Sequence, residues 1–188
     1  MNSRGRLIVF ASPSGGGKGT VIRHLLDKHP AWGFSCSATT RPPRPGEEDG
    51  SHYYFLSRDE FQRRIDAGDF LEYEAVHRDL YGTLKSVTQE RLAKGETVIF
   101  DLDVKGALSV KRHYPEAFSI FVMPPSMEVL EQRLRGRQTE SDDVIRLRLA
   151  RAEMELGLAD QFDIRIVNDV LEQTVTDVER AIADRFDE

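Results

Sequence analysis

A glycine-rich stretch near the start of the chain has the residue types of a phosphate-binding loop. Residues 11–20 read A-S-P-S-G-G-G-K-G-T, so three glycines precede Lys18. Glycines let backbone N–H groups wrap closely around an anion, and a lysine placed after them reaches the β- and γ-phosphates of a nucleotide. The stretch departs from the common pattern G-x-x-x-x-G-K-[ST] at Ser12 and at Gly19. A structural glycine turn is the alternative interpretation, but it does not explain the lysine.

Two aspartates further along the chain have the chemistry to support such a loop. Asp101 and Asp103 stand two residues apart at the end of an apolar run, so both face one side if the strand continues through them. Ligands of α/β sheets bind at the carboxyl ends of strands. Gly19 lacks the hydroxyl that often touches Mg²⁺, so Asp101, acting through water, is the expected metal-shell residue beside Lys18. A helix-capping role is the alternative for either aspartate.

Arginines supply two further groups of candidate phosphate ligands. Arg41 and Arg44 are separated by two prolines, and polyproline II repeats every three residues, so both guanidiniums are expected to project to one side as a clamp for one phosphate. Two solvated surface arginines are the alternative. Six of the twenty arginines fall within residues 133–151, where a mobile lid would bring cations to a phosphoryl group and exclude water. These six are Arg133, Arg135, Arg137, Arg146, Arg148 and Arg151.

The elements that must position these residues follow from the apolar periodicity. Residues 7–10 predict a buried strand, and apolar residues at helical spacing predict a helix from the glycine loop to about Lys28. Further strands are expected at 97–102, 119–123 and 163–167, and further helices at 59–67, at 143–157, from Met127 after an N-cap at Ser126, and along the stripe Leu171, Val175, Val178 and Ile182. This alternation implies a parallel sheet covered on both faces. Residues 34–97 indicate an insertion with its own small sheet, and 135–143 a mobile polar loop.

Composition bounds the class of protein. A chain of 188 residues fits one domain, and a net charge of −6 argues against a general nucleic-acid binder. The single cysteine, Cys36, favours a reducing compartment. The apolar run near the N-terminus is too short for a signal peptide, and no stretch approaches a membrane span. We therefore expect a cytoplasmic protein that binds neither nucleic acid nor membrane; the oligomeric state stays open.

Seven motifs in the chain resemble those of the guanylate kinases, in that family's order and spacing. They are S-C-S-A-T-T-R-P-P-R-P-G-E-E-D-G-S-H-Y-Y-F (35–55), F-L-E-Y (70–73), L-Y-G-T (80–83), F-D-L-D-V-K-G-A (100–107), P-P-S (124–126), R-L-R-G-R (133–137) and I-V-N-D (166–169). The resemblance covers nearly the whole chain. Members of the family commonly have G-K-G-T, so Gly19 is not a departure from their pattern. Ser12 is a departure because glycine is usual there. Lys105, where glutamine is usual, and residues 78–80, where Gly-Asn-Tyr is usual, are others.

The resemblance implies a P-loop α/β fold, with a parallel sheet flanked by helices, a small mixed α+β GMP-binding insertion and a helical lid. The core would comprise residues 1–34 and 97–188, with the lid at about 135–157, and residues 35–96 would bind GMP. The implied reaction is ATP + GMP = ADP + GDP with Mg²⁺, with dGMP as a further substrate. A non-catalytic phosphopeptide-binding module and a P-loop kinase of a non-nucleotide phosphate are the alternatives.

The resemblance also assigns residues to the two substrates. ATP is expected at Ser12, Pro13, Ser14, Gly15, Gly16, Gly17, Lys18, Gly19, Thr20, Asn168 and Asp169, and GMP at Ser37, Arg41, Arg44, Tyr53, Glu72, Tyr81, Thr83 and Asp103. Lys18, Arg137 and Arg148 would act on the transferred phosphoryl group. The other four lid arginines are expected to be helix-surface residues or ion-pair partners.

Glu72 is the residue whose chemistry would select guanine. Guanine presents two adjacent donors, N1–H and N2–H₂, and one carboxylate can accept from both. Adenine presents an acceptor in place of N1–H, and an unpaired buried polar group costs about 1–3 kcal/mol. Taken without its motif, Glu72 would instead be interpreted as a surface carboxylate at a strand edge.

Overall fold

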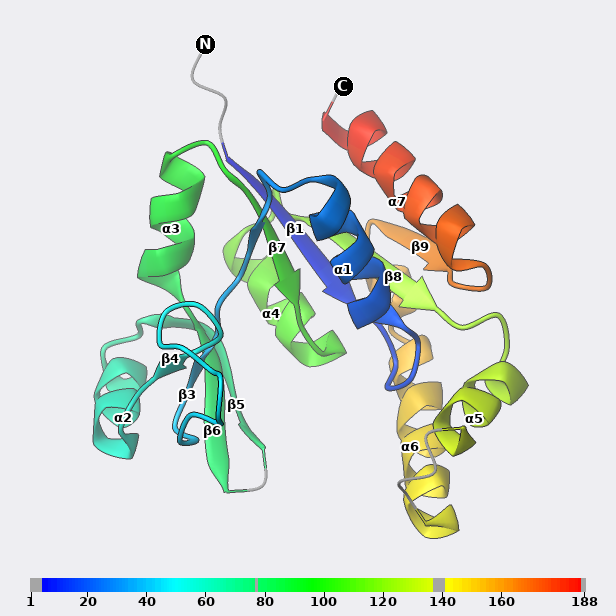
Figure 1. Cartoon of the computed structure of the whole chain (residues 1–188), viewed down its shortest axis with the longest axis horizontal. Coiled ribbons are helices and arrows are strands. Elements are labelled where there is room, and N and C mark those ends of the chain that lie inside the picture. The colour runs from blue at the N-terminus through cyan, green and yellow to red at the C-terminus, as the bar shows by residue number, and fades with distance from the viewer. Residues whose placement is uncertain (1–4, 77, 137–140, 187–188) are drawn as a thin grey trace.

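The computed structural model describes residues 5–76, 78–136 and 141–186. Five parallel strands form the central sheet in the order β2-β7-β1-β8-β9, with helices on both of its faces (Figure 1). The strands are β1 (Arg6–Ala11), β2 (Gly33–Phe34), β7 (Thr97–Asp101), β8 (Phe118–Met123) and β9 (Ile164–Val167). The four strands expected from apolar runs are confirmed within a residue or two, whereas the two-residue strand β2 was not predicted.

The strand β1 is apolar and buried on both faces from Leu7 to Ala11, after Arg6 at its start. Ile8 and Phe10 pack into the cluster formed with α1 (Lys18–Lys28) and α7 (Leu171–Phe186). Leu7 and Val9 alternate with them and pack into the cluster under α4 (Val104–His113). The period of two therefore sends successive side chains into two separate cores. This arrangement fixes β1 firmly, and the glycine loop begins where β1 ends.

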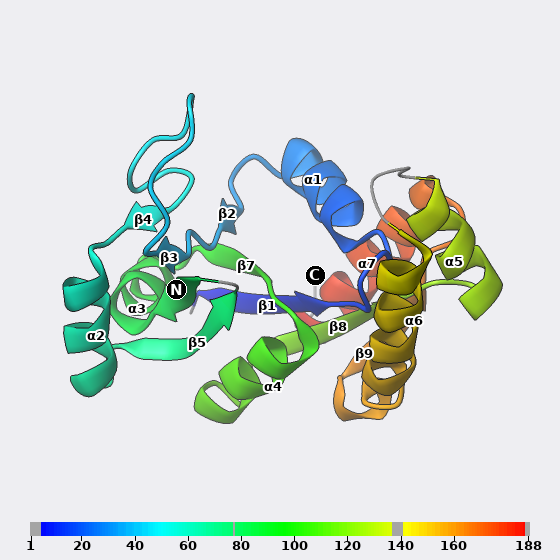
Figure 2. The same cartoon turned by 90° about the horizontal axis from the view of Figure 1, so that it is seen from below.

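A second lobe, made by the inserted segment, has a small mixed sheet of its own (Figure 1, lower left, and Figure 2). Its strand order is β4-β3-β6-β5, and α2 (Arg58–Asp66) packs beside it through a core centred on Phe61 and Phe70. Ser57 caps α2 by accepting a hydrogen bond from Glu60 N at 3.1 Å. The strands are β3 (Ala38–Thr39), β4 (Tyr54–Phe55), β5 (Phe70–Val76) and β6 (Asp79–Leu84), and α3 (Lys85–Ala93) leads back to β7.

A pair of helices lies at the other end of the molecule from this lobe, with the central sheet between them (Figure 2). The helices α5 (Met127–Arg135) and α6 (Asp142–Leu156) pack against each other through Leu130, Leu134 and Ile145. A 3₁₀ turn, η1 (Ala159–Gln161), follows. The expected N-cap at Ser126 is confirmed, because its Oγ accepts from Val129 N at 3.3 Å. Of the predicted polar loop at 135–143, residues 137–140 lie outside the described residues, Arg135 is the last residue of α5, and Asp142 is the first of α6.

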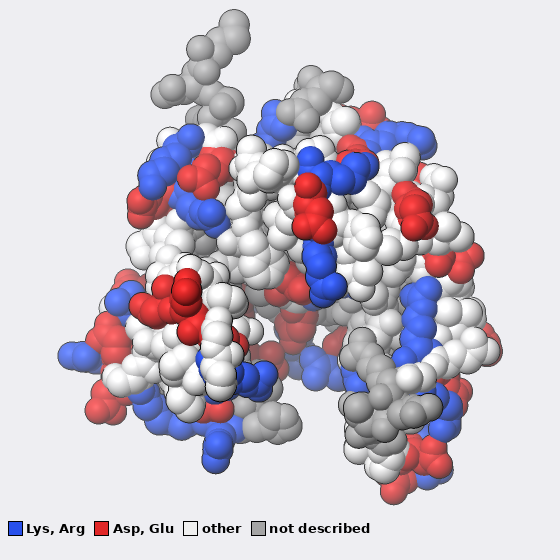
Figure 3. All heavy atoms as spheres, viewed as in Figure 1, with Lys and Arg blue, Asp and Glu red and all other residues white. Residues whose placement is uncertain are grey.

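The lobe and the helical pair face each other across a hollow, and acidic and basic side chains both lie within it (Figure 3). The carboxyl ends of β1 and β7 meet at this hollow, because Phe10 and Asp101 are paired in the sheet register. No helix among the described residues is long and apolar enough to cross a membrane. The fold thus brings the glycine loop, the aspartates and the arginine-rich helices to one side of the molecule.

Candidate active site

The glycine loop is shaped to present backbone N–H groups. Gly15 and Gly17 have φ values of 92° and 88°, the left-handed region that favours glycine. Gly17 is the N-cap of α1 and offers no side-chain oxygen to the first turn of that helix. The first N–H groups of α1 are therefore available to an anion. An added Cβ on Gly15 would come within 2.9 Å of Leu130 and Leu134, so α5 packs directly against the loop.

The serine that replaces the usual first glycine fits into the loop. Ser12 Oγ donates to Pro13 O at 3.1 Å. The Ser12 side chain lies over Gly16, where an added Cβ would be 3.1 Å from the Ser12 Cβ. The side chain therefore occupies space that Gly16 leaves open, and the loop keeps its hydrogen bond from Gly16 N to Pro13 O at 2.9 Å.

We expect Ser12→Gly to leave the KM for ATP within about twofold, because no loop atom has to move to accommodate the serine. Added glycine flexibility in the unfolded chain is expected to lower Tm by about 1–3 °C. Steady-state kinetics with thermal unfolding checks both values, and Ser51→Gly in an exposed turn is the matched control. A tenfold fall in the KM for ATP would show that Ser12 obstructs the nucleotide.

Lys18 and Asp101 form an ion pair at the mouth of the loop. Lys18 Nζ lies 2.6 Å from Asp101 Oδ1 and also donates to the carbonyl oxygen of Leu102. The lysine side chain is only 14% exposed, so its ammonium is held at the end of β7. The sequence placed Asp101 near Lys18, and the structure has the two in contact.

The strand does not continue to Asp103, so the condition under which the two aspartates would face one side is not met. β7 ends at Asp101, and Asp103 is the N-cap of α4, with its Oδ1 accepting from Gly106 N at 2.7 Å. The capping alternative applies here because the free N–H groups of α4 compete for the carboxylate. Both aspartates nevertheless line one cavity of about 1010 Å³, which also borders the glycine loop, Arg148 and Arg151.

The helix α6 reaches the glycine loop through Arg148. Its Nη2 and Nε donate to Ser14 Oγ at 2.5 Å and 3.2 Å. The guanidinium therefore already lies beside the loop where phosphates would bind. Arg137, the other lid arginine expected to contact phosphate, lies outside the described residues.

Arg133 is not the surface residue or ion-pair partner that the sequence suggested. Its Nη2 donates to Asn168 O at 2.8 Å, and its Nη1 is buried without a hydrogen-bond partner. The signal that could have found it is its position three residues after Leu130, which packs on the loop. The remaining three arginines are ion-paired as expected: Arg135 with Glu131 and Asp142, Arg146 with Asp143, and Arg151 with Glu155 and Asp103.

Asn168 fastens the glycine loop to the end of β9. Its Nδ2 donates to Gly16 O at 2.9 Å, and its Oδ1 accepts from Thr174 Oγ1 at 3.2 Å. A Cβ on Gly17 would overlap the Asn168 amide, so the loop and the asparagine are in close contact. Asn168 is buried, whereas Asp169 next to it is exposed.

In the second lobe, Arg41 lies beside the two candidate tyrosines. Its guanidinium is 5.2 Å from the centre of the Tyr53 ring, and the Tyr53 and Tyr81 rings meet edge to face at 6.0 Å. Glu47 holds the guanidinium by two hydrogen bonds of 2.8 Å and 2.9 Å, which lower the pKa of Glu47 to about 2. Arg44 contributes its backbone N–H to Glu47 at 2.7 Å, and its side chain is exposed. The Glu47 carboxylate thus occupies the Arg41 guanidinium that was expected to bind a phosphate.

Glu72 and Thr83 are adjacent across the β5–β6 pair. Thr83 Oγ1 donates to Glu72 Oε1 at 2.6 Å. Burial raises the pKa of the Glu72 carboxyl, the hydrogen bond from Thr83 opposes that shift, and the charge of Asp103 adds to it. A cavity of about 430 Å³ adjoins Glu72 and Asp103, while Ser37 lines a smaller one of about 140 Å³. A partly desolvated carboxylate facing a cavity suits recognition of a hydrogen-bond donor.

A glycine loop that follows a central parallel strand and opens a helix, joined to a second lobe with its own mixed sheet, defines a P-loop kinase-like α/β protein. The family model described as guanylate kinase matches residues 4–185. The chain therefore belongs to the guanylate kinase family.

Known relatives are similar over nearly the whole chain. A guanylate kinase from Chlorobium luteolum is 48% identical over 180 residues, covering 95% of this chain and 91% of the relative. A guanylate kinase from Gloeobacter violaceus is 50% identical over 177 residues, covering 94% and 86%. The crystal structure of guanylate kinase from Anaplasma phagocytophilum has a TM-score of 0.74 at 32% identity, covering 99% of this chain and 88% of that one.

Proposed function

We propose that this chain transfers the γ-phosphoryl group of ATP to GMP, giving ADP and GDP, and that dGMP is also accepted. The observation that carries the proposal is the placement of two chemically different sites around one hollow. The Lys18 loop with Arg148 lies on one side, and the Glu72–Thr83 pair with Arg41 lies on the other. The family of the chain agrees with this assignment. The core, lid and GMP-binding boundaries given above are part of the same proposal.

In this mechanism the side chains position and neutralise rather than react covalently. The attacking phosphate oxygen of GMP is already ionised, so no strong general base is needed. Lys18 would leave Asp101 for the β- and γ-phosphates, while Arg148 would neutralise charge on the transferred group. Arg41 would exchange Glu47 for the GMP phosphate, with Arg44, Tyr53 and Tyr81 beside it. Ser37, Thr83 and Asp103 would complete the guanine contacts around Glu72.

Mg²⁺ fits the residues at the loop only as an ion bound mainly by phosphates and water. Among the described residues no group of three or more His, Cys, Asp or Glu side chains could hold a metal. Asp101 is 31% exposed and is the carboxylate beside Lys18. Mg²⁺ commonly keeps several waters and takes one or two carboxylates, so Asp101 acting through water is compatible with it. When bound, the ion would neutralise developing charge on the phosphates.

A coupled ADP-release assay with GMP, dGMP, AMP, UMP and CMP as acceptors tests the proposal. We expect turnover with GMP and dGMP alone, because only guanine offers the donor pair that Glu72 can accept. Turnover with AMP comparable to that with GMP would contradict the proposed acceptor. Absence of turnover with every acceptor would favour a non-catalytic module instead.

A further inference from the structure

Arg151 joins the lid helix to the carboxylate at the guanine end of the site. Its Nε donates to Glu155 Oε1 at 2.8 Å, one turn further along α6. Its Nη2 donates to Asp103 Oδ2 at 3.3 Å, across 48 positions of sequence. Because Asp103 Oδ1 is already committed to the cap of α4, Arg151 contacts the oxygen that remains for a ligand.

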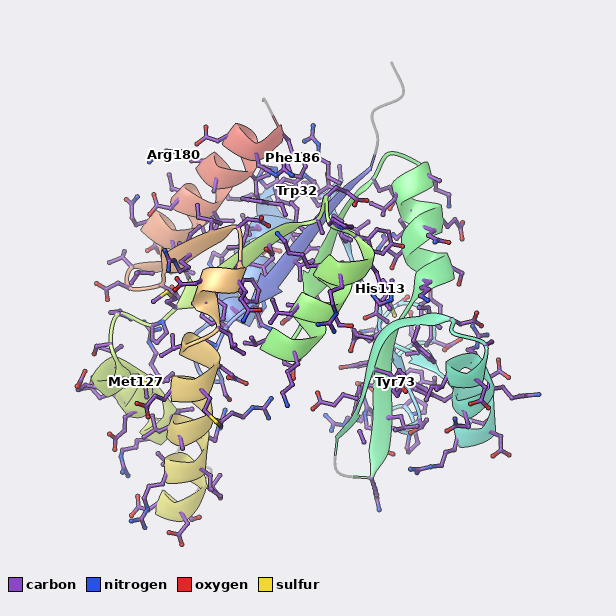
Figure 4. All side chains as sticks on the ribbon, turned by 180° about the vertical axis from the view of Figure 1, so that it is seen from behind. Trp32, Tyr73, His113, Met127, Arg180 and Phe186 are labelled. Carbon is purple, nitrogen blue, oxygen red and sulfur yellow. The ribbon has the colours of Figure 1, made fainter. Side chains whose placement is uncertain are left out.

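Asp103 lies where three parts of the molecule meet. It caps α4, it contacts α6 through Arg151, and it lines one cavity with Glu72 and Glu74 of β5. Figure 4 shows α4 between α6 and the strand that carries Tyr73. Burial, together with the charge of Asp103, raises the pKa of Glu72 on the same strand. Three carboxylates thus share this corner, and burial together with the charge of Asp103 raises the pKa of Glu74 as well.

Arg151 supplies a positive charge to this acidic corner from the lid side. It is held there by Glu155, whose second carboxylate oxygen is buried without a partner. Three residues earlier on the same helix, Arg148 contacts Ser14 of the glycine loop. One face of α6 therefore touches the loop through Arg148 and the guanine end through Arg151.

We propose that Arg151 is a positioning residue of the acceptor site, which orients Asp103 for guanine and couples GMP binding to the nucleotide at the glycine loop. This inference rests on the proposed function. A carboxylate oxygen accepts more than one hydrogen bond, so Arg151 and a guanine amino group can share Asp103 Oδ2. Because Arg148 and Arg151 lie on the same helix, a displacement of α6 by a nucleotide at Ser14 would also displace the Arg151 contact to Asp103.

Calorimetric binding of GMP to Arg151→Ala, with and without a non-hydrolysable ATP analogue, tests the coupling. We expect the Kd for GMP to rise about five- to tenfold, and the Kd for the analogue alone to stay within about twofold. Any enhancement of GMP binding by the analogue in the wild type should disappear. Arg151→Lys, which keeps the charge but loses the fork, should fall between wild type and alanine.

The matched control is Arg146→Ala. Arg146 lies on the same helix and pairs with Asp143 on an exposed surface, 2.7 Å away. It should leave both Kd values unchanged. In an Asp103→Asn background, Arg151→Ala should add nothing further, because the arginine acts through that carboxylate.

Three outcomes separate the inference from the function on which it rests. If the wild type does not bind GMP, the proposed function fails. If the wild type binds GMP and both Arg151 variants bind it equally well, the inference alone is wrong. A parallel loss of GMP affinity, analogue affinity and Tm in Arg151→Ala and Arg151→Lys would assign the arginine a purely structural role, which would also overturn the inference.

Discussion

Replacing Lys18 with methionine is expected to lower kcat about a thousandfold, while the Kd for GMP stays within about twofold. The ammonium is a cation at the glycine loop that can neutralise charge on the β- and γ-phosphates, and removing one such preorganised donor costs about 10²–10³ in kcat. The lysine contacts Asp101 and Leu102 at the ATP side of the hollow, and no contact joins it to Glu72 or Arg41. Single-turnover kinetics with GMP calorimetry separates the two effects.

Lys28→Met is the matched control for this experiment. Lys28 ends the same helix, is 53% exposed, and pairs with Glu179 of α7 at 2.5 Å. The chemical change is identical, but the site is not touched, so kcat is expected to stay within about twofold. A Lys18→Met enzyme with the kcat of the wild type would overturn the assignment of the loop as the ATP site.

The elements that follow from local chemistry were predictable from the sequence, and the exceptions have physical causes. The apolar run of β1 predicted a buried strand, and Ser126 is an N-cap as expected. The two-residue strand β2 carries too few residues to show a period. Asp103 caps α4 because it directly precedes that helix, whose first N–H groups need an acceptor that a strand pattern does not reveal.

In the candidate site, too, the parts built from local contacts were predictable from the sequence, and those built from distant contacts were not. The Lys18 loop could be interpreted from ten consecutive residues, because the anion contacts of such a loop come from its own backbone. The contacts of Arg133 and Arg151 could not be predicted from neighbouring residues, since their partners Asn168 and Asp103 lie 35 and 48 positions away in the sequence. Sequence spacing gives helix faces but not which distant element each face meets.

Replacing Glu72 with glutamine is expected to weaken GMP binding about a hundredfold and to leave ATP binding within about twofold. Each hydrogen bond to a charged group contributes about 1.5–3 kcal/mol, and glutamine keeps one acceptor while turning an amide donor toward a guanine donor. A loss of about 3 kcal/mol corresponds to about a hundredfold in Kd. Calorimetry with GMP and with a non-hydrolysable ATP analogue measures both. Glu60→Gln, in the helix α2 of the same lobe, is the control, because the Glu60 carboxylate pairs with Arg63 and Arg64 of its own helix.

The same substitution should stabilise the free protein at neutral pH, which a merely structural carboxylate would not predict. Burial raises the pKa of Glu72 despite its hydrogen bond from Thr83. A carboxyl whose pKa is raised by folding contributes most to stability below its unfolded pKa, and that contribution is lost as the pH rises through the folded pKa. The ionised group therefore opposes folding at neutral pH, and Glu72→Gln should raise Tm by about 1–3 °C.

The pH dependence of the wild type follows from the same carboxyl. Recognition of guanine needs the ionised form of Glu72, so the KM for GMP should rise as the pH falls toward the raised pKa. Equal losses of GMP and ATP affinity with a lowered Tm would show that Glu72 supports the lobe instead of selecting the base.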